Sequence, residues 1–506
     1  MHLKSFVRRN LAEGALIFAG AIVLIVQFAA EKHFLSDGGT DHTHIIGVPL
    51  DDVYIHCRYA ENLLSGNGYS FNPGHTVSAD TSPLWVVMIA IGGLITSHLD
   101  LIAVLLSSLF YLLLAPAVFR ICRETFLLSY SWSVAAGMLT LLSSRLVWAS
   151  ASGMEVTLAC FLVLVIVHEH IGQRQYGGSM RMREGLFLAL GIGARPELMF
   201  LAVVILSDWL IVAKREKKGF INLLIGSVVF LVFVSPVYAI PLYDRGSLIY
   251  HSAVVQGARI SFIPDMGYLW FALKVLLASF SIPILFAFIA PFLLRKHKGV
   301  VLLGIFGFGL PILLAFIAPQ FRHHGRYFFP VFPVLIIVGI VVLAKLFTTA
   351  SRKKNVIAVH SILVSVALIG AGRGILLSSE SVANINDQHL AVAEWVKTSV
   401  TESDRIAADD VGAIGYFTKR QLIDITGLIS HEFFPLQHNQ QLVWNEARKQ
   451  GANLFIIYTR LNPAFYEFAK DSLELLKEFR VRLPLVASAD TVMSVFRVRG
   501  DSHAAR

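Results

Sequence analysis

The chain has 506 residues, of which 55% are hydrophobic and 15% are charged. Because soluble globular proteins carry about 25% charged residues, this composition excludes an ordinary soluble fold and predicts a membrane protein. The net charge of +9 lies in short Lys/Arg clusters between long apolar runs. This is a membrane-orientation pattern, and it argues against nucleic acid as a partner.

The apolar runs are continuous and long enough for helices that cross a bilayer. They predict a polytopic α-helical membrane protein with about eleven transmembrane helices, within a domain of residues 1–380. The predicted spans are residues 11–30, 99–119, 126–147, 154–170, 184–194, 198–213, 219–240, 267–293, 299–318, 328–348 and 355–375. We interpret the first run as a retained anchor rather than a signal peptide, because it is long and more helices follow. The short fifth and sixth runs are split around Arg195 and Pro196, so they could form one broken hairpin.

The Lys/Arg distribution predicts the orientation. With the N-terminus in the cytoplasm, the cytoplasmic segments hold 18 Lys and Arg residues, whereas the outer loops 31–98, 241–266 and 319–327 hold six. This bias is typical of cytoplasmic loops. The apolar stretch 83–97 is short, so we interpret it as a helix in the outer interface, within one long outer loop of residues 31–98.

The composition changes from about residue 385. Apolar stretches at 405–408, 422–425 and 454–458 predict strands, and amphipathic stretches at 442–449 and 464–476 predict helices. Residues 385–500 are therefore predicted to form a soluble α/β domain, which an eleven-span topology places outside the cytoplasm.

The first outer loop contains two adjacent acids, Asp51 and Asp52, at the start of a predicted interfacial amphipathic helix. A carboxylate there can cap the helix, but capping explains only one of the two. Two carboxylates beside a membrane surface are costly unless they are hydrated or used. One could act as a general base, and the other could steady that base or bind a divalent metal. Arg58, about two helical turns later, could pair with either acid.

Three stretches of this loop carry a resemblance to a known family. Residues 51–63 read Asp-Asp-x-Tyr-Ile-x-x-Arg-Tyr-Ala-x-Asn-Leu, residues 66–74 read Gly-x-Gly-x-x-Phe-Asn-Pro-Gly, and residues 81–85 read Thr-Ser-Pro-Leu-Trp. This pattern resembles the first outer loop of the GT-C membrane glycosyltransferases, in particular the mycobacterial terminal arabinofuranosyltransferases and their bacterial relatives. Sparser similarities follow at residues 152–155, 195–197, 326–330, 410–416 and 424–428.

The resemblance implies a GT-C-like fold and a polyprenyl-phosphate sugar donor. It further implies an inverting single displacement on the outer, periplasmic side of a bacterial inner (plasma) membrane, with Asp51 or Asp52 as the base. The acceptor could be a cell-envelope glycan, a lipid-linked sugar or a protein, and the sugar a hexose or a pentose. Relatives often carry Leu-Pro-Asn-Thr after the seventh span, where residues 246–252 differ, so the sugar stays open.

A cationic cluster lies at the outer mouth between the ninth and tenth predicted spans. It contains Arg322, His323, His324 and Arg326. A phosphate leaving group needs such cations, and Arg326 is our first candidate for this role. The same residues could instead bind lipid headgroups.

The remaining candidates have two interpretations each. Arg195 at the helix break could bind the donor phosphate, or it could pair with Glu155 or Glu197 and brace the fold. Glu155 could face a substrate cavity or cap the following helix. The other predicted substrate-binding residues are Tyr54, Arg58, Thr81, Ser82 and Tyr243.

Two alternative functions stay open on the sequence alone. A transporter or flippase for polar lipids would also need intramembrane charges, but it would not require an Asp-Asp pair or an outer domain. The third interpretation is a non-catalytic partner in envelope assembly, whose C-terminal domain binds glycan.

Overall fold

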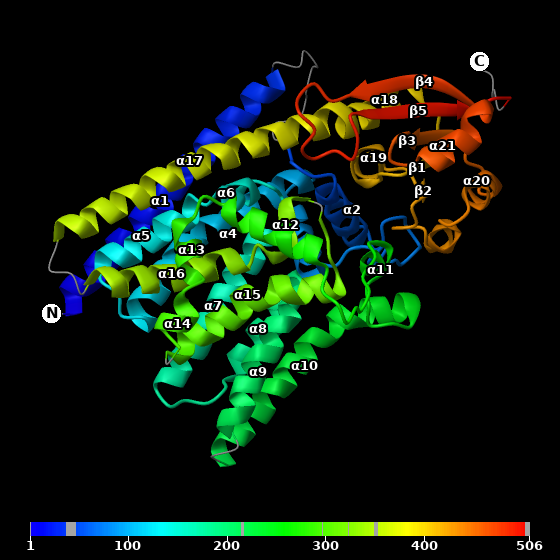
Figure 1. Ribbon diagram of the computed structural model, residues 1–506. Coiled ribbons are helices and arrows are strands. Elements are labelled where there is room, and N and C mark those ends of the chain that lie inside the picture. The colour runs from blue at the N-terminus through cyan, green and yellow to red at the C-terminus, as the bar shows by residue number, and fades with distance from the viewer. Residues whose placement is uncertain are drawn as a thin grey trace.

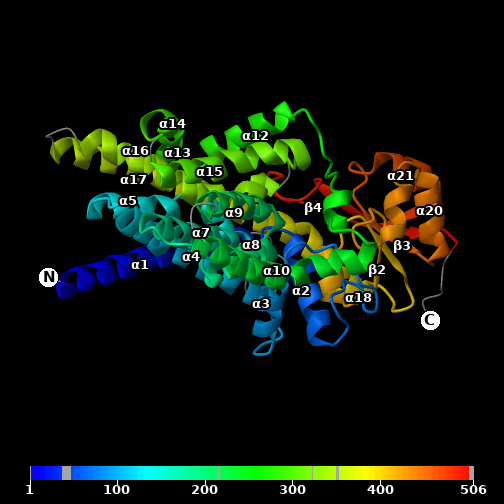
Figure 2. The ribbon, with the colours of Figure 1, turned by 90° about the horizontal axis from the view of Figure 1, so that it is seen from below.

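The structure is a computed structural model that describes residues 2–36, 47–213, 217–295, 297–321, 323–348 and 353–500. A helical bundle contains the N-terminus at one end, and an α/β domain lies at the other end (Figures 1 and 2). The long helices α1 and α17 pack against each other along one side of the bundle.

The bundle contains many helices that suit a membrane. Seven stretches are long and apolar enough to cross a bilayer, within the described part of the chain. They correspond to α1 (His2–Ser36), α4 (Leu99–Arg120), α7 (Val156–Gln175), α9 (Met199–Ala213), α10 (Lys217–Arg245), α15 (Lys298–Ile317) and α17 (Lys353–Ile385). Shorter apolar helices are α3 (Pro83–Gly93), α12 (Met266–Leu277) and α16 (Val331–Thr348). The chain is an integral multi-pass membrane protein, and the number of eleven spans stays a prediction.

Several predicted spans are interrupted. Residues 126–147 form α5 (Tyr130–Leu141) and the start of α6 (Ser144–Ser150), and residues 267–293 form α12, α13 (Ile282–Ala287) and α14 (Ala290–Leu293). The second break occurs where Phe280 adopts a left-handed φ of 54° and Pro283 opens α13. A proline fits the first turn of a helix but removes a hydrogen bond from a helix interior, so the chain restarts there.

The predicted break at Arg195 and Pro196 is confirmed. Helix α8 (Met182–Ala194) ends at Arg195, which has extended backbone angles, and Pro196 opens the 3₁₀ turn η2 (Pro196–Leu198) before α9. The residue before a proline avoids the helical region, which explains the position of this break. Further short helical segments of the bundle are η1 (Ile121–Thr125), α11 (His251–Val255) and η3 (His323–Phe328).

Helix α2 (Asp52–Leu64) lies between the bundle and the α/β domain (Figure 1). The helix is confirmed, but every residue from 53 to 60 is buried, whereas an amphipathic surface helix would have one exposed face. It packs against α3 and α4 on one side and against α19 (Gly412–Thr418) of the α/β domain on the other. The domain therefore covers the face that the sequence alone leaves to solvent or lipid.

The C-terminal domain is an α/β domain, as predicted. Its five-stranded sheet has the order β2-β1-β3-β5-β4. The strands are β1 (Ile406–Ala408), β2 (Leu422–Asp424), β3 (Leu454–Ile457), β4 (Leu473–Arg480) and β5 (Val492–Val498). β1 is parallel to β2 and β3, whereas β5 is antiparallel to β3 and β4. The other helical segments are η4 (Asn386–Leu390), α18 (Ala391–Ser399), η5 (His431–Leu436), α20 (Gln440–Lys449), α21 (Pro463–Ala469) and η6 (Lys470–Ser472).

One predicted helix of this domain is wrong in its second half. The stretch 464–476 is helical only to residue 472, and Leu473 begins β4. The leucines at 473, 475 and 476 fit the spacing of a helix as well as that of a strand. Pairing with β5, from a later part of the sequence, determines the outcome.

Candidate functional site

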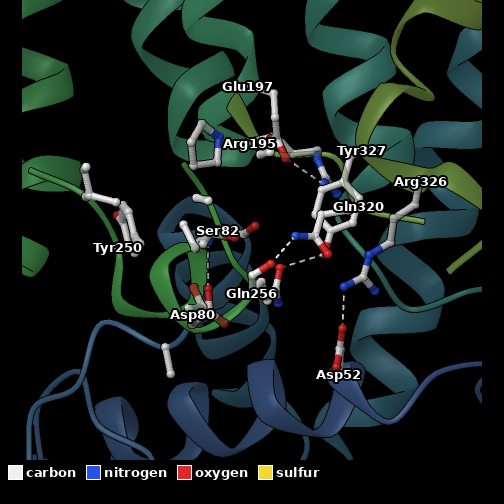
Figure 3. Close-up of a pocket in the computed structure, with 18 of the residues that line it drawn as sticks. Asp52, Asp80, Ser82, Arg195, Glu197, Tyr250, Gln256, Gln320, Arg326 and Tyr327 are labelled. Carbon is white, nitrogen blue, oxygen red and sulfur yellow. Dashed lines mark hydrogen bonds and ion pairs between the residues drawn. The ribbon is translucent and has the colours of Figure 1, made fainter. Parts of the chain in front are cut away.

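A cavity of about 510 Å³ lies where the bundle meets the α/β domain. Its wall combines the first turn of α2, residues 79–82, the start of α7 and the break between α8 and α9. Residues 248–260, the end of α15, η3 and Leu428 of the α/β domain complete it. Segments that are far apart in the sequence therefore line one cavity (Figure 3).

Arg326 and Asp52 form an ion pair at this cavity. Arg326 lies in η3 after two left-handed residues, His324 and Gly325, and its Nη2 donates to Asp52 Oδ2 at the start of α2. Arg326 is 5% exposed. Burial alone favours the neutral guanidine, but the Asp52 carboxylate raises the pKa of Arg326 above its ordinary value, so the group stays charged.

Two donors of Arg326 are unused. Its Nε and Nη1 are buried, and neither has a hydrogen-bond partner among the described residues. A buried charged donor without a partner is costly, so this guanidinium is suited to an anionic ligand that enters the cavity.

Besides the Arg326–Asp52 pair, a network of alternating positive and negative side chains lies along the cavity wall. His56 Nδ1 binds Asp80, and His56 Nε2 lies 3.2 Å from Glu155 Oε2. Arg195 donates through Nη1 to Glu155 and through Nη2 to Glu197 Oε1 at 3.2 Å. Each charged side chain in this network lies beside at least one side chain of opposite charge, which is what burial of ions requires.

The protonation states follow from these contacts. Burial lowers the pKa of His56, but Asp80 and then Glu155 raise it to about 10, so both ring nitrogens carry protons at neutral pH. Burial raises the pKa of Glu155, but Arg195 and then His56 lower it to about 2. His56 and Glu155 therefore both stay ionised at neutral pH.

The two cavity arginines share one aromatic ring. The Cζ atoms of Arg195 and Arg326 lie 5.1 Å and 5.4 Å from the centre of the Tyr327 ring. Figure 3 shows both guanidinium groups on the same side of the cavity, with Asp80 and Ser82 across from them. An aromatic face holds a guanidinium by cation–π attraction without using its donors, so the Nε and Nη1 donors of Arg326 remain available to a ligand.

The predicted site residues divide into two groups. Those that line the cavity are Asp52, Thr81, Ser82, Glu155, Arg195 and Arg326. Those that do not are Asp51, Tyr54, Arg58 and Tyr243. Arg322 lies outside the described residues, as does the side chain of His323. His324 packs its ring against Trp148, with 5.2 Å between ring centres.

The residues of the second group have other contacts. Asp51 accepts hydrogen bonds from the backbone N–H groups of Gly412 and Ala413, at 2.7 and 2.8 Å, at the start of α19. Tyr54 stacks on Tyr416 of α19. Arg58 pairs with Glu61 at 2.7 Å and also donates to two backbone carbonyls, those of residues 71 and 419. Tyr243 is 83% exposed.

Sequence reasoning did not assign a role to His56, Asp80, Tyr327 or the glutamines 256 and 320, which also line the cavity. One signal was available, because His56 follows Asp52 by four positions and therefore shares its face of α2. Asp80 directly precedes the Thr-Ser-Pro motif, and its Oδ1 accepts from the backbone N–H of Ser82 at 2.7 Å. Its pairing with His56 depends on the fold.

One interpretation of the acid pair from the sequence is a divalent metal at Asp51 or Asp52. In the structure the two carboxylates have different partners, α19 for Asp51 and Arg326 for Asp52. Another set of residues has metal-binding geometry, since ligand atoms of Asp51, His389 and Asp410 lie within 4.8 Å of one another.

Comparisons with known proteins identify the fold. A family described as a domain of unknown function (DUF8728) matches residues 383–496, and no curated protein matches the chain. The structure of ArnT from Cupriavidus metallidurans bound to undecaprenyl phosphate is 13% identical, with a TM-score of 0.60, and the match covers 96% of this chain and 98% of that chain.

Two structures of an oligosaccharyltransferase from Archaeoglobus fulgidus are also similar. The apo form is 12% identical with a TM-score of 0.57, and the match covers 94% of this chain and 76% of that chain. The oligosaccharyltransferase AglB, in complex with an inhibitory peptide and a dolichol-phosphate, is 11% identical with a TM-score of 0.51. This match covers 96% of this chain and 75% of that chain. The chain therefore has the fold of these structures, in agreement with the GT-C-like fold that the sequence predicts, and carries an α/β domain at its C-terminus.

Proposed function

We propose that this protein is a GT-C glycosyltransferase that transfers a sugar from a polyprenyl-phosphate donor to an acceptor hydroxyl or amide. The observation that carries the proposal is the cavity with two buried arginines against Tyr327, where Arg326 has two unused donors. Planar, charged guanidinium donors suit a phosphate, whose oxygens accept several hydrogen bonds.

The similar structures support the class of donor and leave the acceptor open. ArnT was solved with undecaprenyl phosphate, and AglB with a dolichol-phosphate and a peptide. For this chain we propose a polyprenyl-phosphate sugar as donor. A cell-envelope glycan, a lipid-linked sugar or a protein is the acceptor class.

The proposed chemistry is a single inverting displacement. Asp52 takes the proton from the acceptor as the acceptor atom forms its bond to the sugar C1. The bond between C1 and the phosphate oxygen breaks, and its electron pair leaves with the phosphate. Arg326 and Arg195 stabilise the charge that develops on this leaving group. The donor phosphate accepts hydrogen bonds from Arg326 in place of Asp52. The Asp52 carboxylate is then ready to accept a proton.

We assign Asp52 rather than Asp51 as the base. The Asp52 side chain is 31% exposed and lines the cavity, whereas Asp51 is 6% exposed and its carboxylate is occupied by Gly412 and Ala413. A base must reach the proton that it removes, and this geometry favours Asp52. Thr81 and Ser82, on the same wall, are proposed contacts of the sugar or the acceptor.

The orientation is also part of the proposal. The Lys/Arg bias supports a cytoplasmic N-terminus, and it supports a position of the cavity and the α/β domain on the extracytoplasmic side of the plasma membrane. We propose residues 1–380 as the transmembrane catalytic part and residues 385–500 as the extracytoplasmic domain.

The test is a transfer assay on the purified full chain with a panel of labelled polyprenyl-phosphate sugars and acceptors. We expect transfer by the wild type and a loss of about 10² to 10⁴-fold in kcat for Asp52→Asn. The control is Asp100→Asn, which changes an acid in the first turn of α4, outside the cavity lining.

Two results would overturn the proposal. One is full transfer by a correctly folded Asp52→Asn variant, which would remove the base assignment. The other is movement of labelled lipid across reconstituted vesicles without sugar transfer to any acceptor, which would favour a flippase.

A further inference from the structure

A cluster of two buried side chains and one partly exposed side chain joins the first loop of the bundle to the α/β domain, beside the cavity but outside its lining. Its members are Asp51, His389 and Asp410, from three separate segments. Asp51 precedes α2, His389 lies in η4 after the long helix α17, and Asp410 follows strand β1. Asp51 and His389 are 6% and 1% exposed.

The cluster has the geometry of a set of metal ligands. One ligand atom from each residue lies within 4.8 Å of the others, and His389 Nε2 is 2.9 Å from Asp410 Oδ2. Each oxygen of Asp51 accepts one backbone N–H, from Gly412 or Ala413, and keeps a second lone pair. These N–H groups orient the carboxylate in the way that outer hydrogen bonds orient metal ligands.

The charge balance at the cluster also favours a cation. Asp409 lies next to Asp410, and its Oδ1 is buried without a hydrogen-bond partner among the described residues. The carboxylates of Asp51 and Asp410 converge on His389, and Asp409 adds a third at the neighbouring position of the chain. In the described part of the chain, His389 is the one cationic side chain with which any of the three forms an ion pair. Buried carboxylates in excess over cations are costly unless a proton or a metal ion compensates them.

We propose that Asp51, His389 and Asp410 bind one divalent transition-metal ion, of the Zn²⁺ or Mn²⁺ class, which clamps the start of α2 to the α/β domain. The imidazole nitrogen selects this class over Mg²⁺ and Ca²⁺, which prefer oxygen ligands throughout. Three protein ligands leave a coordination position for water. The Tyr458 hydroxyl lies beside the cluster, 3.1 Å from His389 Nε2.

The proposed metal ion would position the first turn of α2 and would not contact the substrate. Asp51 directly precedes Asp52, the residue that pairs with Arg326 in the cavity. A metal that fixes Asp51 also fixes the first turn of α2, so Asp51 is a positioning residue. The metal site does not depend on the proposed transferase activity, because metal content and thermal stability report it without any substrate.

The experiment uses the full chain in detergent, first treated with a chelator and desalted. It is then incubated separately with Zn²⁺, Mn²⁺, Mg²⁺ or Ca²⁺ and desalted again, and its metal content is measured by mass spectrometry. We expect about one Zn²⁺ or Mn²⁺ ion per chain and a higher Tm with that ion, because a ligand that binds only the folded state stabilises it. We expect no retained Mg²⁺ or Ca²⁺.

Variants locate the site. His389→Gln and Asp410→Asn are expected to weaken binding at least about tenfold. His431→Gln, at another histidine of the same domain, is expected to retain the metal and its Tm increase. A cobalt-loaded wild type adds a readout that needs no variant, because Co²⁺ in a mixed nitrogen and oxygen site absorbs visible light.

The inference fails if the chelated wild type takes up neither ion and its Tm does not change. The three residues are then a hydrogen-bonded ion cluster that shares protons. It also fails if folded His389→Gln and Asp410→Asn retain as much metal as the wild type, because the ion then binds elsewhere.

Discussion

Asp51 and Asp52 are neighbours in the sequence, but their carboxylates have different tasks in the structure. Asp52 lies at the cavity with Arg326, and Asp51 binds the start of α19. At a junction between loop and helix, successive side chains point in different directions, so two identical residues can serve two separate contacts. Their substitution should therefore give two different kinds of loss.

We expect Asp52→Asn to lower kcat by about 10² to 10⁴-fold with little change in Tm, because the amide removes the base and is partly solvated. We expect Asp51→Asn to lower Tm, because its amide group turns an N–H donor toward the N–H groups of Gly412 or Ala413. Kinetic assays and thermal unfolding of both variants check this pair of outcomes. The assignment is contradicted if Asp51→Asn loses kcat at an unchanged Tm while Asp52→Asn remains fully active.

A second prediction concerns the leaving-group phosphate. Arg326→Lys keeps one positive charge near Asp52, but a lysine cannot reproduce the separate Nε and Nη1 donors. We expect kcat/KM for the lipid donor to fall by on the order of 10², as for the loss of one donor to a developing anion.

Arg245→Lys is the matched control for this substitution. Arg245 donates to His251 at 3.0 Å and does not line the cavity, so kcat/KM should stay near that of the wild type. Equal losses in the two variants would show that a general charge effect, rather than the geometry of Arg326, limits the reaction.

At the scale of elements, the position of α2 depends on close packing against α19. A Cβ atom added at Gly412 would lie 2.3 Å from Asp51 Oδ2 and 2.4 Å from the Asp51 carbonyl oxygen. The second contact is with backbone, so the two elements must separate to relieve it. Gly412→Ala is therefore expected to destabilise the protein by about 1–3 kcal/mol, which a lower Tm would report.

Gly172→Ala is the control for this packing prediction. A Cβ at Gly172, within α7, meets nothing within 4 Å. We expect an unchanged or slightly higher Tm, because alanine favours helix over glycine by about 1 kcal/mol. A Tm of Gly412→Ala equal to that of this control would mean that α2 and α19 are not held in close contact.

The elements themselves could be predicted where local sequence is sufficient. The long apolar runs, the break at Arg195 and Pro196, and the short strands β1 to β3 all follow from hydropathy, proline chemistry and strand pattern. The strand β4 could not be predicted, because its identity depends on pairing with β5. The burial of α2 could not be predicted either, because the helix that covers it comes from residues 412–418.

At the scale of the whole molecule, the same limit applies to the site. Residue chemistry predicts Asp52, Glu155, Arg195 and Arg326 one by one as candidate site residues, but their pairings cross large distances in the sequence. Asp52 and Arg326 are 274 residues apart, and Asp51 and Gly412 are 361 apart. No periodicity or local motif encodes such contacts, and they become visible only when the bundle and the α/β domain are assembled.

The ion-pair network around His56 joins α2, residue 80, the start of α7 and the break after α8. The ionisation of His56 therefore affects the stability of the whole fold. The pKa of His56 is raised from its ordinary 6.5 to about 10. A base with a raised pKa contributes stability that is fully present below pH 6.5 and is lost as the pH rises to about 10. We therefore expect the Tm difference between wild type and His56→Gln to be constant in mildly acidic buffer and to shrink between pH 6.5 and 10. Thermal unfolding across this range measures it, with His438→Gln, an exposed histidine, as the control that should follow the wild type. A difference that stays constant between pH 6.5 and 10 would mean that His56 is neutral in the folded protein, and that Asp80 and Glu155 do not hold its second proton.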